Sequence, residues 1–144
     1  SIIGFLFLNW SPSKVFMGDS GSTFLGTILT FIIFSFDQML NSLALLLIAS
    51  PLLMDAGICV IRRFLSGHNI FKAHKMHLYQ RLNQSGLSHS SVSLMYILST
   101  FALSLGYLFF GFKVLLTFTI LVLIFGFFLD HLIAVPFKKI SLKN

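Results

Sequence analysis

The residues best suited to chemistry lie in segment 9–22, which reads NWSPSKVFMGDSGS. It places the carboxylate of Asp19 among glycines, with hydroxyls at Ser20 and Ser22 and a cation at Lys14. Glycine allows a backbone to approach a ligand closely, and a carboxylate with free lone pairs can hold a hard cation such as Mg²⁺. The alternative is a turn whose aspartate caps the following helix. Spacing alone leaves both interpretations open.

The composition is that of an integral membrane protein. Of the 144 residues, 56% are hydrophobic, 18 are Phe and only 10% are charged, and the mean hydropathy is +0.93. Soluble domains are about one quarter charged. The net charge of +6 is carried between apolar segments, which fits membrane lipid headgroups and phosphate substrates better than nucleic acid. The single cysteine, Cys59, excludes an intrachain disulfide.

The apolar segments predict an all-α protein with four full transmembrane helices and a partial one at the N-terminus. A spanning helix needs about 20 apolar residues. The partial span covers residues 2–10, and the full spans cover 23–36 with its flanks, 42–61, 92–110 and 114–136.

The span 42–61 is predicted to break near Pro51, because proline removes a helical hydrogen bond and clashes with the preceding turn. Asp55 follows one turn later. An ionisable residue at membrane depth is a functional candidate. A helix-end aspartate would instead pair with Arg62 or Arg63. The sequence leaves both interpretations of Asp55 open.

The long polar segment 62–91 contains a predicted helix over residues 71–82. On such a helix His74, His77 and Arg81 share one stripe, so the imidazoles would face whatever the segment encloses. Phe71 belongs to a neighbouring apolar stripe that could lie on the membrane surface. The cations that we predict to bind substrate phosphate are Arg62, Arg63, Lys72, Lys75 and Arg81. Arg62 and Arg63 would in addition set the topology in the membrane.

The distribution of basic residues predicts the orientation in the membrane. Nine of the ten basic residues fall on one side of the predicted spans and only Lys113 on the other. Basic residues concentrate on the cytoplasmic side. We therefore expect segment 9–22, segment 62–91 and the C-terminus to face the cytoplasm.

Three strings, in this order, resemble one family: FMGDSGS after NWSPSKV, then PLLMDAGICVIRRFLSG, then AHKMHLYQRL. They are similar to the polyprenyl-phosphate N-acetylhexosamine-1-phosphate transferases, the glycosyl transferase family 4 in the broad sense. The likeness covers residues 1–91 in motif terms, and the last two spans agree only in hydrophobicity. HKMHLYQRL resembles the branch that initiates O-antigen and other surface polysaccharides. It lacks the three consecutive histidines of the peptidoglycan branch, which disfavours a muramoyl-pentapeptide substrate.

The resemblance implies that an N-acetylhexosamine-1-phosphate passes from a UDP-sugar to undecaprenyl phosphate, with release of UMP. It implies Mg²⁺, with Mn²⁺ as an alternative, held by Asp19. It also implies catalytic roles for Asp19, His74 and His77 around a shared pocket, and a location in a bacterial inner membrane. Asp55, Ser20 and Ser22 are further candidate site residues because of their own positions in the sequence.

The family's aspartate-rich loop has no counterpart in the sequence. We therefore expect residues 1–144 to be the C-terminal half of a polytopic enzyme, inactive alone and completed by an N-terminal half or a second copy. Two other classes stay open. One is a non-catalytic membrane subunit that binds lipid phosphate, and the other is a transporter fragment with an ion site at 51–55.

Overall fold

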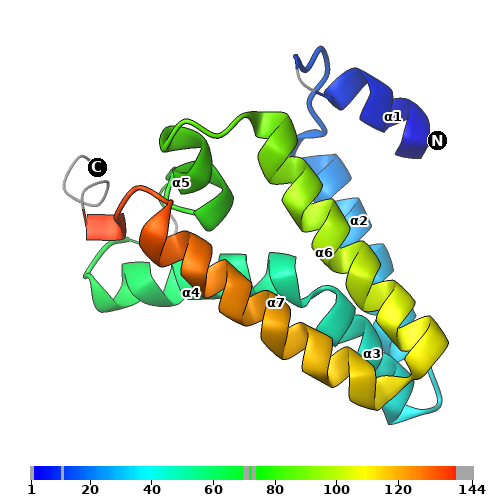
Figure 1. Cartoon of the computed structure of the whole chain (residues 1–144). Coiled ribbons are helices and arrows are strands. Elements are labelled where there is room, and N and C mark those ends of the chain that lie inside the picture. The colour runs from blue at the N-terminus through cyan, green and yellow to red at the C-terminus, as the bar shows by residue number, and fades with distance from the viewer. Residues whose placement is uncertain (1, 11, 70–71, 73, 139–144) are drawn as a thin grey trace. The chain divides into compact units, whose positions relative to one another are not determined.

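The computed structural model describes residues 2–10, 12–69, 72 and 74–138, and over these residues it contains helices and no strand. The prediction of an all-α protein is therefore confirmed for the described part (Figure 1). The helices are α1 (Ile2–Asn9), α2 (Gly18–Phe34), α3 (Met39–Ile48), α4 (Ser50–Leu65), α5 (Leu78–Gln84), α6 (His89–Phe110) and α7 (Phe112–Leu132).

The chain divides into two compact units, Ser1–Leu46 and Leu47–Asn144. In the first unit, the link between α1 and α2 folds back on α1. The side-chain amide of Asn9 donates to the Val15 carbonyl at 2.8 Å, and the Lys14 amide donates to the Leu8 carbonyl at 2.9 Å. These bonds position the residues that lead into α2.

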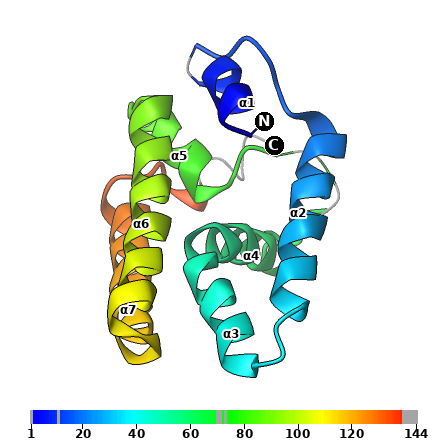
Figure 2. The same ribbon diagram turned by 90° about the vertical axis from the view of Figure 1, so that its right-hand side faces the viewer.

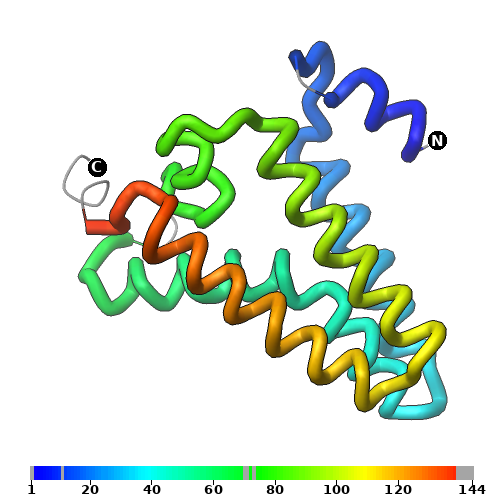
Figure 3. The backbone as a smooth tube through the Cα atoms, viewed as in Figure 1, coloured from blue at the N-terminus to red at the C-terminus, as the bar shows by residue number. Residues whose placement is uncertain are grey.

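The second unit is built on a helical hairpin of α6 and α7, with α4 and α5 packed against it (Figures 1 and 2). A single residue, Gly111, joins the two long helices, and its φ of 79° and ψ of −171° lie in a region that only glycine occupies readily. Figure 3 traces this reversal between the yellow and orange parts of the chain.

Small residues allow α6 and α7 to approach closely, as is common between membrane helices. Gly106 of α6 is buried, and a Cβ there would lie 3.1 Å from the ring of Phe118. Leu103 and Leu115 are fully buried in the same interface. The outer faces expose large apolar side chains, such as Leu108 and Phe127, which suits contact with lipid.

The helices account for two to three membrane crossings. The 22 residues of α6 and the 21 of α7 are long and apolar enough to span, and α3 with α4 counts as a third span if the pair is taken together. The predicted break near Pro51 is present, because α3 ends at Ile48 and Pro51 lies in the first turn of α4. With 17 residues, α2 is about 26 Å long. The predicted count of four full spans and a partial one is thus not confirmed.

Two predicted boundaries were wrong. Segment 9–22, which the sequence predicts as a loop before the span 23–36, is helical from Gly18 onward, and Asp19, Ser20 and Ser22 lie in the first turns of α2. The predicted helix 71–82 begins only at Leu78, and His77 before it has extended backbone with φ −60° and ψ 152°. Phe71 and residues 139–144 of the basic tail lie outside the described residues.

We predict that Gly111→Ala lowers the free energy of unfolding in detergent micelles by about 1–3 kcal/mol, because a Cβ is strained at this backbone conformation. Gly126→Ala is the matched control, since a Cβ at that position in α7 has no neighbour within 4 Å. Alanine there favours the helix by up to about 1 kcal/mol. Equal effects of the two substitutions would contradict the role given to Gly111.

Candidate functional site

The carboxylate of Asp55 connects three helices of the second unit. It projects from α4 and accepts the amide hydrogen of Leu78 at 2.7 Å and that of Tyr79 at 3.3 Å. The Tyr96 hydroxyl of α6 donates to it at 2.8 Å. The side chain is only 7% exposed. Asp55 therefore satisfies the first free amides of α5 from outside that helix, which explains why α5 begins at Leu78.

The contacts of Asp55 favour a role in positioning the histidine segment. Arg62 pairs with Asp130, and Arg63 donates to the carbonyls of Asn69 and Lys72. The imidazole of His77 lies beside Asp55, with 3.8 Å between Nδ1 and Oδ1. Asp55 is thus a buried acid that holds the histidine segment against α4.

His74 and His77 come together, although not on a helix. Their rings stack with centroids 4.9 Å apart, and the His77 ring also stacks on Tyr79 at 5.6 Å. Met76 between them is only 2% exposed and packs with Cys59, Val135 and Phe137. Burial of a methionine contributes about 2 kcal/mol, so Met76 anchors the segment and directs both imidazoles toward α4.

Burial lowers the pKa of His74, and the Arg63 guanidinium and His77 lower it further. Since the ordinary value is 6.5, His74 is neutral at neutral pH, and its Nδ1 accepts the amide hydrogen of Met76 at 3.4 Å. A neutral imidazole can accept a proton or bind a metal ion.

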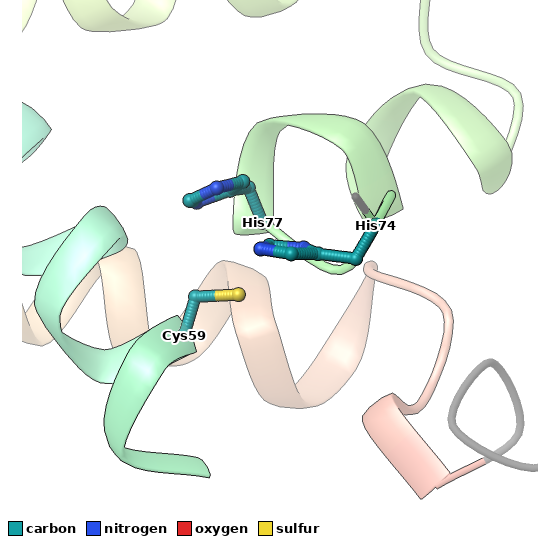
Figure 4. Close-up of side chains that lie close together, drawn as sticks. All are labelled: Cys59, His74 and His77. Carbon is teal, nitrogen blue, oxygen red and sulfur yellow. The ribbon is translucent and has the colours of Figure 1, made fainter. Parts of the chain in front are cut away.

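Cys59 lies one turn after Asp55 on the same face of α4, below the two imidazoles (Figure 4). One potential ligand atom from each of Cys59, His74 and His77 lies within 4.8 Å of the others. Among the described residues, these three form the group of His, Cys, Asp or Glu side chains that could together hold a metal ion.

Arg62 and Arg81 share the carboxylate of Asp130. Arg62 donates to one of its oxygens at 2.6 Å, and Arg81 donates to the other. Arg81 is 3% exposed and also donates to the Val135 carbonyl at 3.0 Å. Burial, and next the charge of Arg62, lower the pKa of Arg81. Both guanidiniums lie about 6 Å from the ring centre of Phe137, at 5.9 and 6.0 Å.

The remaining predicted phosphate-binding cations differ in their availability. Arg63 is 2% exposed and donates to the carbonyls of Asn69 and Lys72, which fixes the segment after α4. Lys72 and Lys75 are exposed, and no ion pair engages them among the described residues.

Asp19 is exposed in the first turn of α2, where the positive end of the helix dipole favours an acid. The Ser22 hydroxyl donates to its backbone carbonyl at 3.0 Å, and within the described ranges no hydrogen bond or ion pair occupies its carboxylate. Ser20 is exposed beside it. Asp19 belongs to the first unit and the histidines to the second, so the pocket that we predict them to share stays a prediction.

A cavity of about 240 Å³ lies beside the charged cluster in the second unit. Asp55, Arg62 and Asp130 are among its polar lining residues, and its walls are otherwise largely apolar, with Tyr96 and Phe127 among them. Such a cavity can take an apolar group whose polar end meets the cations.

Sequence reasoning missed Cys59, Tyr96 and Asp130 as site residues. The spacing of Asp55 and Cys59 by four residues would have placed the thiol on the face of the acid. Asp130 is one of only four acids and lies in a long apolar run, and that rarity was the available signal. Tyr96 carried no signal in the sequence.

Comparison with known proteins identifies a matching family model and several relatives of the chain. Residues 1–37, which include Asp19, match the family model described as glycosyl transferase family 4. The chain is 38% identical over 105 residues to the probable undecaprenyl-phosphate N-acetylglucosaminyl 1-phosphate transferase of Bacillus subtilis (strain 168), covering 68% of the chain and 29% of that protein. The chain is a relative of glycosyl transferase family 4.

Other relatives come from two branches. The decaprenyl-phosphate N-acetylglucosaminephosphotransferase of Mycolicibacterium smegmatis is 35% identical over 111 residues, covering 66% of the chain and 27% of that protein. The phospho-N-acetylmuramoyl-pentapeptide-transferase of Leptospira biflexa is 35% identical over 96 residues, covering 64% of the chain and 24% of that protein. No solved structure matches the chain significantly. The matches thus span less than a third of each glycosyl transferase family 4 relative.

We predict that Asp55→Ala lowers the free energy of unfolding of this family 4 relative by about 3 kcal/mol, because it leaves two amides of α5 without their charged acceptor. Hydrogen exchange at the amides of Leu78 and Tyr79 is expected to accelerate. Asp55→Asn keeps one acceptor oxygen and is expected to lose less.

Asp37→Ala is the matched control for Asp55, since Asp37 is an exposed acid in the turn after α2. It should leave both stability and exchange unchanged. Unaltered exchange at Leu78 and Tyr79 in Asp55→Ala would show that the carboxylate does not hold α5.

Proposed function

We propose that the chain forms part of a membrane enzyme that transfers N-acetylhexosamine-1-phosphate from a UDP-sugar to a polyprenyl phosphate. The observation that carries this proposal is the family 4 match over residues 1–37, because it includes the FMGDSGS motif with its unoccupied carboxylate. The named relatives act on polyprenyl phosphates or are phospho-N-acetylmuramoyl-pentapeptide-transferases. A membrane location of the helices agrees with a lipid acceptor.

The proposed reaction exchanges one phosphoanhydride bond for another. An anionic oxygen of the polyprenyl phosphate attacks the phosphorus bonded to the sugar. The bond from that phosphorus to the bridging oxygen breaks, and UMP leaves with the electron pair. No oxidation occurs. A polyprenyl phosphate that has already lost both phosphate protons has no proton to give up during the attack. In such transfers the protein chiefly positions the reactants and stabilises charge on oxygen.

We assign the charge stabilisation to the cations near the histidine segment. Exposed Lys72 and Lys75 are suited to meet a diphosphate, and the partly exposed Arg62 adds a planar donor. His74 and His77 would donate hydrogen bonds to the phosphate oxygens. Arg63 and Arg81 would hold the histidine segment in place and not contact the phosphate, because both residues are buried.

Asp19 fits a role with Mg²⁺, or with Mn²⁺ in its place. Mg²⁺ is held in proteins by one or two carboxylates together with water and substrate phosphates, and Asp19 offers one exposed carboxylate at a helix start. When bound, the ion would supply charge neutralisation at the diphosphate. Ser20 and Ser22, in the same turns of α2, are suited to bind its water shell.

The cavity and the apolar faces of α6 and α7 support the lipid part of the proposal. Arg62 lines the cavity together with largely apolar residues, as an isoprenoid phosphate requires. For the donor we favour UDP-N-acetylglucosamine or a similar amino sugar in surface-polysaccharide synthesis, since the HKMHLYQRL string lacks consecutive histidines.

A chimera tests the proposal, because the chain spans only part of its relatives. The matched segment of the Mycolicibacterium smegmatis protein is replaced by the corresponding residues of this chain. Release of UMP from UDP-N-acetylglucosamine is then measured in membranes supplied with decaprenyl phosphate and Mg²⁺. We predict that the chimera is active and that Asp19→Asn reduces its kcat at least 100-fold, or about 3 kcal/mol in barrier.

Asp37→Asn in the same chimera is the matched control and should retain full activity, since Asp37 lies at the other end of α2 from Asp19. Full activity of the Asp19→Asn chimera would refute the assignment of this acid. Ion flux through liposomes that contain the unaltered chain, without any transferase activity of the chimera, would favour the transporter alternative.

A further inference from the structure

The group formed by Cys59, His74 and His77 has a chemistry that phosphoryl transfer does not require. The Cys59 sulfur points from α4 toward the two imidazoles, which come from the segment before α5 (Figure 4). One ligand atom of each residue lies within 4.8 Å of the others. Cys59 is 3% exposed, while His77 keeps a quarter of its side chain exposed, at 25%. The group is therefore buried on the thiol side and accessible on the imidazole side.

A thiolate with two imidazoles is a ligand set for a soft or borderline metal ion, whereas Mg²⁺ prefers oxygen. In a tetrahedral zinc site with Zn–S of about 2.3 Å and Zn–N of about 2.0 Å, the ligand atoms lie about 3.3–3.6 Å apart. The atoms here need to approach one another by little more than about 1 Å. Rotation of the two imidazoles can supply that movement.

We propose that Cys59, His74 and His77 form a three-ligand site for a thiophilic divalent cation such as Zn²⁺, whose fourth position is open to water or a phosphate oxygen. Binding would displace the thiol proton of Cys59, since only the thiolate is a ligand. Three protein ligands with an open fourth position are the arrangement of an accessible zinc site rather than a closed structural one.

The surroundings of the group support such a site. Asp55 Oδ1 lies 3.8 Å from His77 Nδ1, where a carboxylate commonly orients a metal-binding histidine through its second nitrogen. Met76 is buried between the two histidines and holds their backbone against α4. The charge of Arg63 opposes a cation, and the thiolate and the Asp55 carboxylate offset it.

Cobalt is the probe for this site, because Co²⁺ replaces Zn²⁺ and absorbs light when a thiolate binds it. The purified chain in detergent, with its helicity checked by circular dichroism, is titrated with Co²⁺ alone. We expect a thiolate-to-cobalt charge-transfer band that saturates at one ion per chain and that Zn²⁺ abolishes by displacement. The chain has a single cysteine, so this band can come only from Cys59.

Variants assign the other ligands. Cys59→Ser is expected to remove the charge-transfer band. His74→Ala and His77→Ala are each expected to weaken cobalt binding by at least about 10-fold, because even the loss of a residue that only hydrogen-bonds to a metal ligand lowers metal affinity by that much. His89→Ala is the matched control, because His89 is exposed at the start of α6, outside the group. It should leave the binding constant unchanged.

The absence of a charge-transfer band in the folded unaltered chain at saturating Co²⁺ would overturn the proposal. An equal loss of affinity in His89→Ala and His77→Ala would also overturn it, since the imidazole ligands would then lie elsewhere. Both results are read without any enzyme assay.

One consequence rests on the proposed function. Because Zn²⁺ would occupy the imidazoles that we assign to substrate phosphates, it should inhibit the chimera, and Cys59→Ser should weaken that inhibition relative to the variant's own activity without zinc. An inactive chimera would count against the transferase proposal only, while the cobalt band would still report the metal site.

Discussion

The second unit depends on the need to satisfy one buried carboxylate. Asp55 has 7% of its side chain exposed, and an unpaired charge there would cost several kcal/mol. Its partners are two amides of α5 and the hydroxyl of Tyr96 on α6. This requirement determines where α5 begins, and it thereby places His77 beside α4. The position of the histidines is therefore a consequence of an acid on the helix that precedes them, α4.

Features determined by neighbouring residues were predictable from the sequence. Pro51 marked the break before α4, and the lengths of the last two apolar segments predicted α6 and α7 within a few residues. The start of α5 was not predictable, since the carboxylate that caps Leu78 comes from a residue 23 positions earlier. Helical periodicity placed His74 and His77 on one stripe, whereas a buried Met76 brings them together in extended backbone.

The candidate site was predictable in its residue types more than in its partnerships. The motif around Asp19 and the histidine segment were identifiable, because aspartate and histidine are rare in an apolar sequence. Nothing local indicated that Arg62 and Arg81 would share Asp130, which lies 68 and 49 residues away. Such pairings follow from helix packing, and a single sequence contains no direct record of it.

The shared carboxylate of Asp130 makes the two arginines unequal. Both Asp55 and Asp130 line the same cavity as the two guanidiniums, and Asp130 contacts both of them. Arg81 is almost fully buried and cannot change partners, while Arg62 keeps 33% of its side chain exposed. An incoming anion would therefore compete with Asp130 for Arg62 alone, and its departure would restore the original pair. Asp130 would act in this sense as an internal counter-ion for Arg62 while no anion is bound.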